Sequence, residues 1–586
     1  MPPSSSSSSS TNCRYDPQWQ PHLPDECWES IFKHLTHPHD LESLSLVSRH
    51  FLSLTNRLLT HLNVSDHVLP LLPALLRRFP NLTSIKLTRY FTCDIDALLS
   101  QIASFDLPSL HSLDISHQST FRSHGLRQFS QKFPTLKSFY CSRMRPDLVL
   151  IAECFPNLEE IHVTFASLYS DKDLHVKALT SGLKKLRKVD LSCTSNILQD
   201  SSIFTLCQNC VSLEALVVGE TSSVSNIGIA NAIRQRPQLR SSDVRGGDVT
   251  VELIDTLVSL KFLTCLDLSY SDISDEALCA LADGVLPLRK LSLGGCRGYQ
   301  YNGISCLLRK CNNLQYLDLQ STRFLNDECV IELSFLLGNL NVVELSGNAN
   351  LTDLSLFAIM CNCPLITEIR MDNTSVGKQK LEEDCVVVNS HVKFLYLARN
   401  SCLNDESVKM IASVCPNLEM MELSHCRMVS VGAVEVLWRC CKIQRIDLAH
   451  LGYGLSQFQL RINFEVPTLF ELDLSRLSIS NEELSLISKS CYNLKELKLD
   501  YCDKITTRGV KQVVKNCKQL RMIGLYSCEK VSSDIVSWMV LARPSLRKIR
   551  APRYSRHSVG QGNQFLRHGC FVRWIPKERN VLLLKF

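Results

Sequence analysis

A six-residue pattern, Leu-x-x-Leu-x-Leu, recurs along most of this 586-residue chain and constrains its fold more than any other feature. Weaker copies included, it begins nineteen times between Leu82 and Leu546, and every interval from Leu288 onward is 25 or 26 residues. Apolar residues at alternate positions are typical of a short β-strand with one buried face. So constant a register indicates one structural unit repeated along the chain, in place of the roughly four separate domains that the length alone predicts.

Each unit also contains a helix start after its strand. Short polar side chains followed by acidic residues occur there, as in the segments ISDEAL at Ile273 and LNDESV at Leu403. The polar side chain accepts from free backbone N–H groups, and the acids meet the positive end of the helix dipole. The predicted capping residues are Ser274, Asn326, Thr352, Asn404 and Ser480.

One strand and one helix in 20 to 29 residues is the period of leucine-rich repeats. Such units bury their faces against their neighbours. We therefore predict an α/β fold in which about 19 strand–helix units form a curved solenoid over residues 82–551, with parallel strands on the concave face. Residues 65–81 are expected to form a helical linker or cap, and residues 552–586 a basic C-terminal cap or tail.

The N-terminal residues follow different patterns. Residues 1–21 are rich in Ser and Pro and too poor in apolar side chains to offset their ordering entropy, which predicts a disordered lead. A Leu-Pro pair and two acids then open a helix, and Asp40 is expected to cap a second one. Helical spacing places one set of residues on a single face of each helix. These are Trp28, Ile31, Phe32 and Leu35 on the first helix, and Leu44, Val47, Ser48 and Phe51 on the second. A small helical module is predicted over residues 22–64.

This module resembles an F-box. The run LPDECWESIFKHLTHPHDLESLSLVSRHF has the Leu-Pro opening, the Ile-Phe pair, the Asp-Leu at the second helix and the Leu-x-x-Val before an aromatic residue. Ser48 and Phe51 stand where the family often has cysteine and tryptophan. The resemblance implies an adaptor face or its support made by Leu23, Pro24, Ile31, Phe32, Leu35, Leu44, Val47 and Phe51.

The 27 cysteines, an odd number, indicate reduced thiols. Seven lie three residues before a strand pattern, and four lie eight residues after the start of one. These two positions are typical of the cysteine-containing repeats often found behind an F-box, and they suit buried corners where a small side chain with a weak donor fits. Zinc binding by Cys207 with Cys210, or by Cys361 with Cys363, is the alternative. The eleven cysteines at the two positions are Cys210, Cys311, Cys363, Cys415, Cys440, Cys491 and Cys517, and then Cys296, Cys426, Cys502 and Cys528.

The concave face offers candidates for partner binding. One side chain per strand is predicted to point to the concave face, and nine of these nineteen positions are acidic, which favours a basic partner segment. The competing interpretation is that Leu-Asp-Leu-Ser is simply a common repeat sequence. A narrower candidate site for a protein substrate is Arg370, Phe394, Tyr396 and Met420, because aromatic, Arg and Met side chains are enriched at interface hot spots. It adjoins two irregular units, and repair of local stacking is the competing interpretation.

F-box/leucine-rich repeat proteins of this layout include long plant members. The resemblance implies a non-catalytic substrate receptor of an SCF-type ubiquitin ligase. Its partners would be a Skp adaptor, through that adaptor a cullin, and an unknown protein target for degradation. A small-molecule receptor and a non-ligase scaffold remain alternatives. We expect no cofactor, no metal, no catalytic site and no membrane span, and location in the nucleus or cytoplasm. The segment 546–586 holds ten Lys/Arg against one acid, yet its interleaved apolar residues favour a cap over a nucleic-acid site.

Overall fold

The computed structural model describes residues 23–35, 38–65, 68–88, 94–116, 118, 123–144, 148–165, 178–192, 198–219, 223–379, 387–430, 432–451, 462–553 and 559–573. The chain divides into two compact units, Met1–Ser138 and Phe139–Phe586. The predicted lead over residues 1–21 lies outside the described residues.

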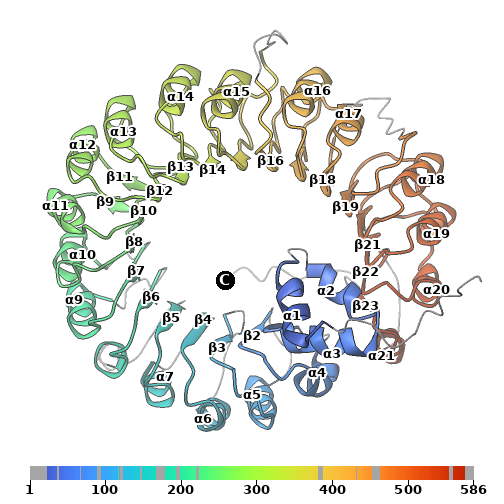
Figure 1. The fold of residues 1–586 in the computed structure, drawn as a ribbon, viewed down its shortest axis with the longest axis horizontal. Helices are drawn as coiled ribbons and strands as arrows, with labels where there is room; N and C mark the ends of the chain where they lie inside the picture. The colour runs from blue at the N-terminus through green and yellow to red at the C-terminus, as the bar shows by residue number, and fades with distance from the viewer. Residues whose placement is uncertain are drawn as a thin grey trace, which may run out of the picture. The chain divides into compact units, whose positions relative to one another are not determined.

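The first unit begins with three short helices and continues into strand–helix repeats (Figure 1). Its strands β1, β2 and β3 pair in parallel, with Leu62 beside Ile85 and Ile85 beside Leu113. β1 lies inside the segment 22–64 assigned to the F-box module and matches the pattern with Val64 in the last place, so the ladder begins one strand before Leu82. The elements are α1 (Asp25–Lys33), α2 (Pro38–Leu44), α3 (Arg49–Leu58), β1 (His61–Val64), η1 (Leu69–Leu71), α4 (Leu72–Arg78), β2 (Ser84–Leu87), α5 (Ile95–Ala103), β3 (Ser112–Asp114) and α6 (Ser123–Lys132).

The predicted second helix is in fact two. α2 ends at Leu44 and residues 45–47 form a turn, so Val47 and Phe51 do not share a helical face with Leu44. The break has a local cause, because Ser48 is extended and its hydroxyl accepts from the Phe51 N–H at 3.1 Å, capping α3. The predicted cap Asp40 lies within α2, which begins at Pro38.

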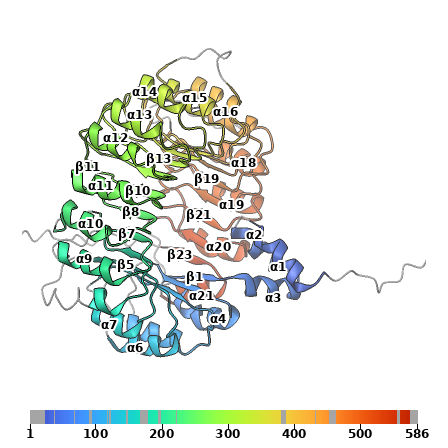
Figure 2. The same ribbon diagram turned by 60° about the vertical axis from the view of Figure 1, so that its left-hand side comes forward.

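The second unit is a solenoid of parallel strands on the inner side and helices on the outer side (Figures 1 and 2). Every one of the nineteen patterns, in the two units together, contains a strand that begins two residues after its first apolar position. The strands are β4 (Ser138–Met144), β5 (Glu160–Phe165), β6 (Lys188–Asp190), β7 (Ala215–Val217), β8 (Ser241–Asp243), β9 (Gly247–Asp248), β10 (Cys265–Asp267), β11 (Ser271–Asp272), β12 (Lys290–Ser292), β13 (Tyr316–Asp318), β14 (Val342–Glu344), β15 (Glu368–Arg370), β16 (Phe394–Tyr396), β17 (Met420–Glu422), β18 (Arg445–Asp447), β19 (Glu471–Asp473), β20 (Glu496–Lys498), β21 (Met522–Gly524), β22 (Lys548–Arg550) and β23 (Phe571–Arg573).

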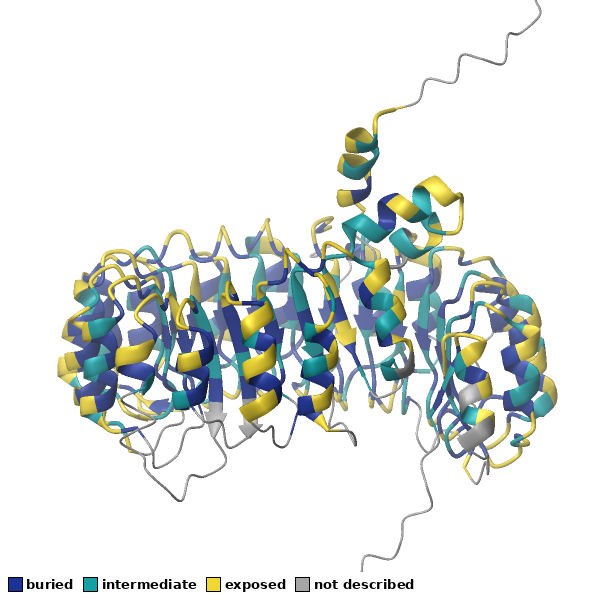
Figure 3. Cartoon of the chain, turned by 90° about the horizontal axis from the view of Figure 1, so that it is seen from below, coloured by how far each residue is buried: buried dark blue, intermediate teal, exposed yellow. Residues whose placement is uncertain are grey.

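In chain order, the helices of the second unit alternate with these strands. Buried residues line their inner sides and exposed ones their outer sides (Figure 3). Among the described residues no helix lies between β15 and β16 or between β18 and β19, the two irregular units. The helices are α7 (Leu148–Cys154), η2 (Ala178–Gly182), α9 (Asp200–Asn209), α10 (Asn226–Ile233), α11 (Val251–Ser259), α12 (Asp275–Asp283), α13 (Tyr301–Leu308), α14 (Asp327–Ser334), α15 (Asp353–Asn362), α16 (Asp405–Val414), α17 (Gly432–Arg439), α18 (Asn481–Ser490), α19 (Thr507–Asn516), α20 (Ile535–Ala542) and α21 (Val559–Arg567).

Parallel pairing runs in register through the second unit. From β5 to β23 each strand of the main sheet pairs with the next, while β9 and β11 pair separately. The central strand residue is buried, as are Leu266, Leu317 and Leu395, and the residues on either side of it are mostly half-exposed. Each strand therefore presents two side chains to the concave face, whereas one side chain per strand was predicted.

The predicted helix caps are confirmed. Asn326 accepts from the Cys329 N–H at 2.9 Å, and Ser480 forms a capping box with Glu483. Ser274, Thr352 and Asn404 accept from backbone N–H groups in the same way. Capping is a local interaction, which is why the sequence reveals it.

The eleven repeat cysteines are all buried, as predicted. At the position eight residues after a pattern start, the thiol donates to a carbonyl of the preceding repeat, as from Cys296 Sγ to Leu268 O at 2.9 Å and from Cys528 Sγ to Leu499 O at 2.9 Å. Asn348 and Asn400 occupy the same position and donate to the same kind of carbonyl. The shared requirement is a small buried donor that joins two repeats.

Candidate functional site

The residues predicted for the adaptor face divide into an exposed set and a buried set. Leu23, Pro24, Ile31, Leu35 and Val47 are exposed, with 47% of Ile31 and 66% of Val47 accessible. Phe32 is buried, and Leu44 and Phe51 are half-buried. Exposed apolar side chains are candidates for an interaction surface. The exposed set is therefore the candidate binding surface, and the aromatic residues support it.

Sequence reasoning missed Leu46, which is the most exposed large hydrophobic residue of this module at 76%. It lies in the turn between α2 and α3 beside Val47. The helical periodicity that located the other residues assigns no face to a turn residue. The sequence signal for Leu46 is that Leu46 and Val47 form an apolar pair between the end of α2 and the capping residue Ser48.

An aromatic cluster joins α1 to α3 beneath these residues. The Phe51 ring centroid lies 5.0 Å from that of Trp28 and 5.1 Å from that of Phe32. The Phe51 and Phe32 rings meet edge to face. Such offset and edge-to-face pairs stabilise beyond their buried area by about 0.5–1.5 kcal/mol. Phe51 occupies the position where the F-box family often has tryptophan, and here its ring makes these packing contacts.

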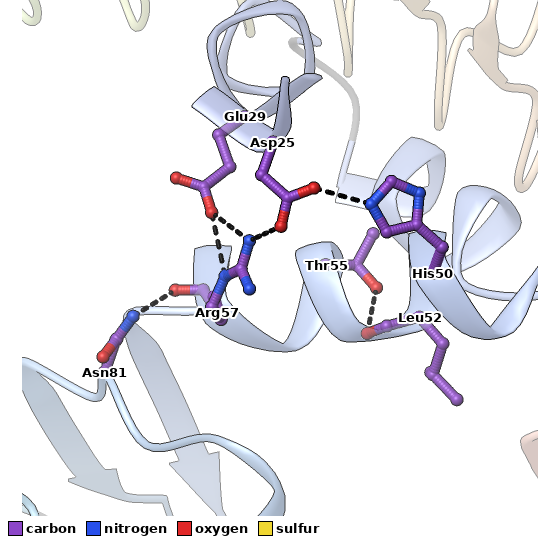
Figure 4. A network of polar contacts seen from close by, with 7 residues as sticks. All are labelled: Asp25, Glu29, His50, Leu52, Thr55, Arg57 and Asn81. Carbon is purple, nitrogen blue, oxygen red and sulfur yellow. Dashed lines mark hydrogen bonds and ion pairs between the residues drawn. The ribbon is translucent and has the colours of Figure 1, made fainter. Parts of the chain in front are cut away.

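A polar network fastens the same two helices at their ends (Figure 4). Arg57 of α3 donates to Asp25 Oδ2 at 2.7 Å and to Glu29 Oε1 at 2.9 Å, and His50 Nε2 lies 2.7 Å from Asp25 Oδ1. The Arg57 hydrogen bond, followed by that of His50, lowers the pKa of Asp25. Asn81 donates to the Arg57 carbonyl at 3.0 Å and so links α3 to the first repeats.

The four predicted substrate-binding residues are brought together on β15, β16 and β17. Register pairs Arg370 with Tyr396 and Phe394 with Met420. The Arg370 guanidinium lies 4.6 Å from the Tyr396 ring centroid, and its Nε donates to Glu368 at 2.6 Å. Burial is the main cause of the raised pKa of Tyr396. The result is a half-exposed group in which Arg370 covers the Tyr396 ring and Met420 is the strand neighbour of Phe394.

The acidic residues of the strand face have structural partners. Asp447 Oδ1 accepts from the Ala449 N–H at 2.9 Å, and Asp473 accepts from Ser475 in the same way. Burial raises the pKa of Asp447, with that of Asp318, to about 6. Lys498 Nζ lies 2.9 Å from Asp473 Oδ2. These bonds explain why Leu-Asp-Leu-Ser recurs, because the carboxylate accepts from the backbone where the strand ends. The recurrence of these acids therefore gives no separate support to the hypothesis that they bind a basic partner segment.

The cysteine pairs considered for zinc have, among the described residues, no third ligand grouped with them. Burial raises the pKa of Cys207 to about 12 and of Cys210 to about 11, which favours the thiol over the thiolate that binds metal. Cys363 is buried whereas Cys361 is exposed. Within the described ranges, no three His, Cys, Asp or Glu side chains are grouped to hold an ion. None of the helices described there combines the length and apolar character of a membrane span.

Comparison with known families matches both parts of the chain. The F-box-like family model matches residues 20–64, and the Leucine Rich repeat model matches residues 259–282. GRR1-like protein 1 of Arabidopsis thaliana is 23% identical over 281 residues, which are 40% of this chain and 46% of that protein.

Two further relatives match at a similar level of identity. A Transport inhibitor response 1-like protein of Oryza sativa subsp. japonica is 27% identical over 276 residues, 40% of this chain and 47% of the relative. F-box/LRR-repeat protein 4 of Bos taurus is 26% identical over 213 residues, 34% of each chain. In each case the match spans less than half of the relative's length.

Proposed function

We propose that this chain, which has an F-box-like domain at its N-terminus followed by leucine-rich repeats, is a substrate receptor of an SCF-type ubiquitin ligase. The F-box-like domain would dock a Skp-type adaptor, and through it a cullin. The strand face would hold a protein target for ubiquitination and degradation. The observation that carries the proposal is the group of exposed apolar residues on the F-box-like module, which lies in the same chain as a long strand face.

In this role the chain performs no bond chemistry. It raises the effective concentration of the target near the charged enzyme, which is the contribution that tethering makes. Its reduced, buried thiols suit the nucleus or the cytoplasm, which we propose as its location.

A protein target suits the strand face better than a small molecule. The hollow on β17 to β20 has a volume of about 160 Å³ and is lined by alternating charges, among them Arg445, Glu471 and Lys498. Typical small-molecule pockets enclose about 300–1,000 Å³ with mostly apolar walls. A shallow, charged strand face is suited to an extended partner surface.

Replacing Ile31 and Val47 with alanine together is expected to weaken adaptor binding by at least about tenfold, because each side chain loses apolar area that the adaptor would bury. Co-purification of the full chain with a recombinant Skp adaptor, followed by titration, measures the effect. Phe335→Ala is the matched control, since Phe335 is 69% exposed on the solenoid. No binding by the intact chain, or equal binding by the double variant, would refute the proposal.

Replacing Phe394 and Tyr396 with alanine together is expected to abolish capture of the target without unfolding the chain, because both side chains are half-exposed. Proximity labelling under proteasome inhibition identifies proteins that depend on the intact receptor. Tyr316→Ala is the control, since Tyr316 is a half-exposed strand aromatic under Lys290. Labelling that is unchanged in the double variant would remove this site from consideration.

A further inference from the structure

A row of residues with left-handed backbone follows the strands of the second unit. In each case the residue lies three positions after the last residue of its strand. From Gly246 to Tyr501 its N–H donates to a carbonyl of the next repeat, as from His425 N to Ala449 O at 2.8 Å. The left-handed turn lets the backbone form this hydrogen bond between repeats at the point where the chain departs from the sheet. The row comprises Gly246, Tyr270, Gly295, Ser321, Gly347, Asn373, Arg399, His425, His450, Arg476, Tyr501 and Ser527, all with φ between 52° and 82°.

Glycine adopts this conformation without cost, whereas other residues pay about 1–2 kcal/mol for it. Three members of the row are glycine, and two more are serine. From Arg399 to Tyr501, however, five consecutive members carry large planar side chains. We call these five residues, Arg399, His425, His450, Arg476 and Tyr501, the edge column.

Two neighbouring pairs of the edge column stack through their planar groups. The His425 and His450 rings are 4.1 Å apart and inclined by 17°. The Arg476 guanidinium lies 4.0 Å from the Tyr501 ring centroid. Because each stacked group turns a face toward its neighbour, the edges of the imidazole and guanidinium groups, with their N–H donors, remain available to a partner.

The positive charge of the edge column is not neutralised within the described part of the chain. Arg399, Arg476 and the neighbouring Arg427 have exposed side chains, and none has a carboxylate within 4.0 Å there. Cations on the adjoining strand face differ, since Arg370, Lys393 and Arg445 each pair with a glutamate. Residues 452–461, which follow His450 closely and lie outside the described residues, contain no Asp or Glu.

Burial, together with the surrounding cations, lowers the pKa of His425 and of His450, the latter to about 4. Both rings are therefore neutral near pH 7, and each keeps one N–H donor. A neutral pair between two guanidinium groups avoids repulsion in the free protein while still offering hydrogen-bond donors.

We infer that the edge column binds an acidic segment of a partner protein, whose carboxylate or phosphate groups accept hydrogen bonds from Arg399, Arg427 and Arg476. Charge-assisted hydrogen bonds of this kind are about twice as strong as neutral ones. Five repeats at about 4.8 Å span about 19 Å, which an extended segment of about six residues covers. Nucleic acid fits less well, because bases stack on exposed faces and the His425–His450 and Arg476–Tyr501 pairs already turn one face toward each other.

As a description of the substrate class, this inference rests on the proposed receptor function. Its test is independent of that function, because peptide binding is measured on the chain itself. The full chain is titrated with fluorescent eight-residue peptides that are Asp/Glu-rich, phosphoserine-containing, or neutral with Asn and Gln, and with a single-stranded oligonucleotide. Fluorescence anisotropy reports the dissociation constants.

Arg399→Ser with Arg476→Ser is the test variant, since serine already occupies this row at Ser321 and Ser527 with the same sign of φ. We expect an acidic peptide to bind at least tenfold more weakly to the variant, while adaptor binding is unchanged. Tyr270→Ser, in the same row outside the edge column, is the matched control and should bind like the natural chain.

The two acidic arms separate the sources of negative charge. Preference for the Asp/Glu peptide assigns carboxylates, and preference for the phosphoserine peptide assigns phosphate. Failure of both acidic peptides to bind, or equal binding by the double variant, overturns the inference. Tighter binding of the oligonucleotide, lost in the same variant, also overturns it and identifies a nucleic-acid surface instead.

Discussion

Replacing Asn400 with alanine is expected to destabilise the solenoid by about 3–5 kcal/mol, because the change leaves several buried polar groups without partners. The side chain is fully buried. Its amide donates to Met371 O at 2.8 Å and Leu397 O at 2.9 Å, and its oxygen accepts from Thr374 N at 2.9 Å and Thr374 Oγ1 at 2.7 Å. Alanine provides neither donor nor acceptor, and it leaves a void between two repeats.

Denaturant unfolding and hydrogen exchange of residues 366–430 measure this loss, the second because repeats can open locally. Asn417→Ala is the control, since Asn417 makes a single exposed bond to Ser390 O at 2.9 Å. Asn400→Cys should recover part of the stability, because Cys426 occupies the same repeat position and donates to Leu397 O at 3.1 Å. Equal destabilisation by Asn400→Ala and Asn417→Ala would contradict the role assigned to this position.

Gly303→Ala is expected to destabilise the chain by about 1–3 kcal/mol, although alanine in a helix ordinarily stabilises by about 1 kcal/mol relative to glycine. An added Cβ would lie 2.4 Å from Asp275 Oδ1 and 2.8 Å from the Asp275 Cα, which is backbone and cannot rotate away. The Gly303 N–H also donates to Asp275 Oδ1 at 3.1 Å. The close approach joins α13 to the start of α12.

Thermal and denaturant unfolding of Gly303→Ala and Gly338→Ala test the sign. A Cβ at Gly338 would meet nothing within 4 Å, so that variant should be neutral. The same close approach occurs between Gly432 and Asp405 and between Gly509 and Asn481. A Gly303→Ala variant as stable as the natural chain would show that the two repeats separate at little cost.

Features held within one repeat were predicted well. Strand positions and the helix caps Ser274 to Ser480 depend on residues close in the chain. The repeat cysteines bond across repeats, but their burial was predicted because they recur at two fixed positions of the pattern. One prediction failed where a short polar residue had two possible roles, because Ser48 was placed on the face of one helix but caps another. The acids of Leu-Asp-Leu-Ser, given a possible binding role, also bond to backbone N–H groups two residues ahead, so their recurrence has a structural cause.

The F-box motif identified its module but not which motif residues face outward. Ile31 and Phe32 are adjacent in the sequence, yet one is exposed and the other is buried against Phe51. That division follows from the angle between α1 and α3, which the aromatic cluster and the Arg57 network fix. Leu46 lies outside any helical periodicity and was found only from its exposure.

By itself the sequence determined the strand and helix of each repeat, their spacing and the presence of an F-box-like module, because hydrophobic periodicity and capping act over a few residues. Only the tertiary structure decided which residues meet across repeats. Asn400 bonds to the Met371 carbonyl, Gly303 to Asp275, and His425 stacks on His450, at separations of 25 to 29 residues. Those contacts exist only when neighbouring repeats stack in register, and they create both the buried bonds and the exposed edge column.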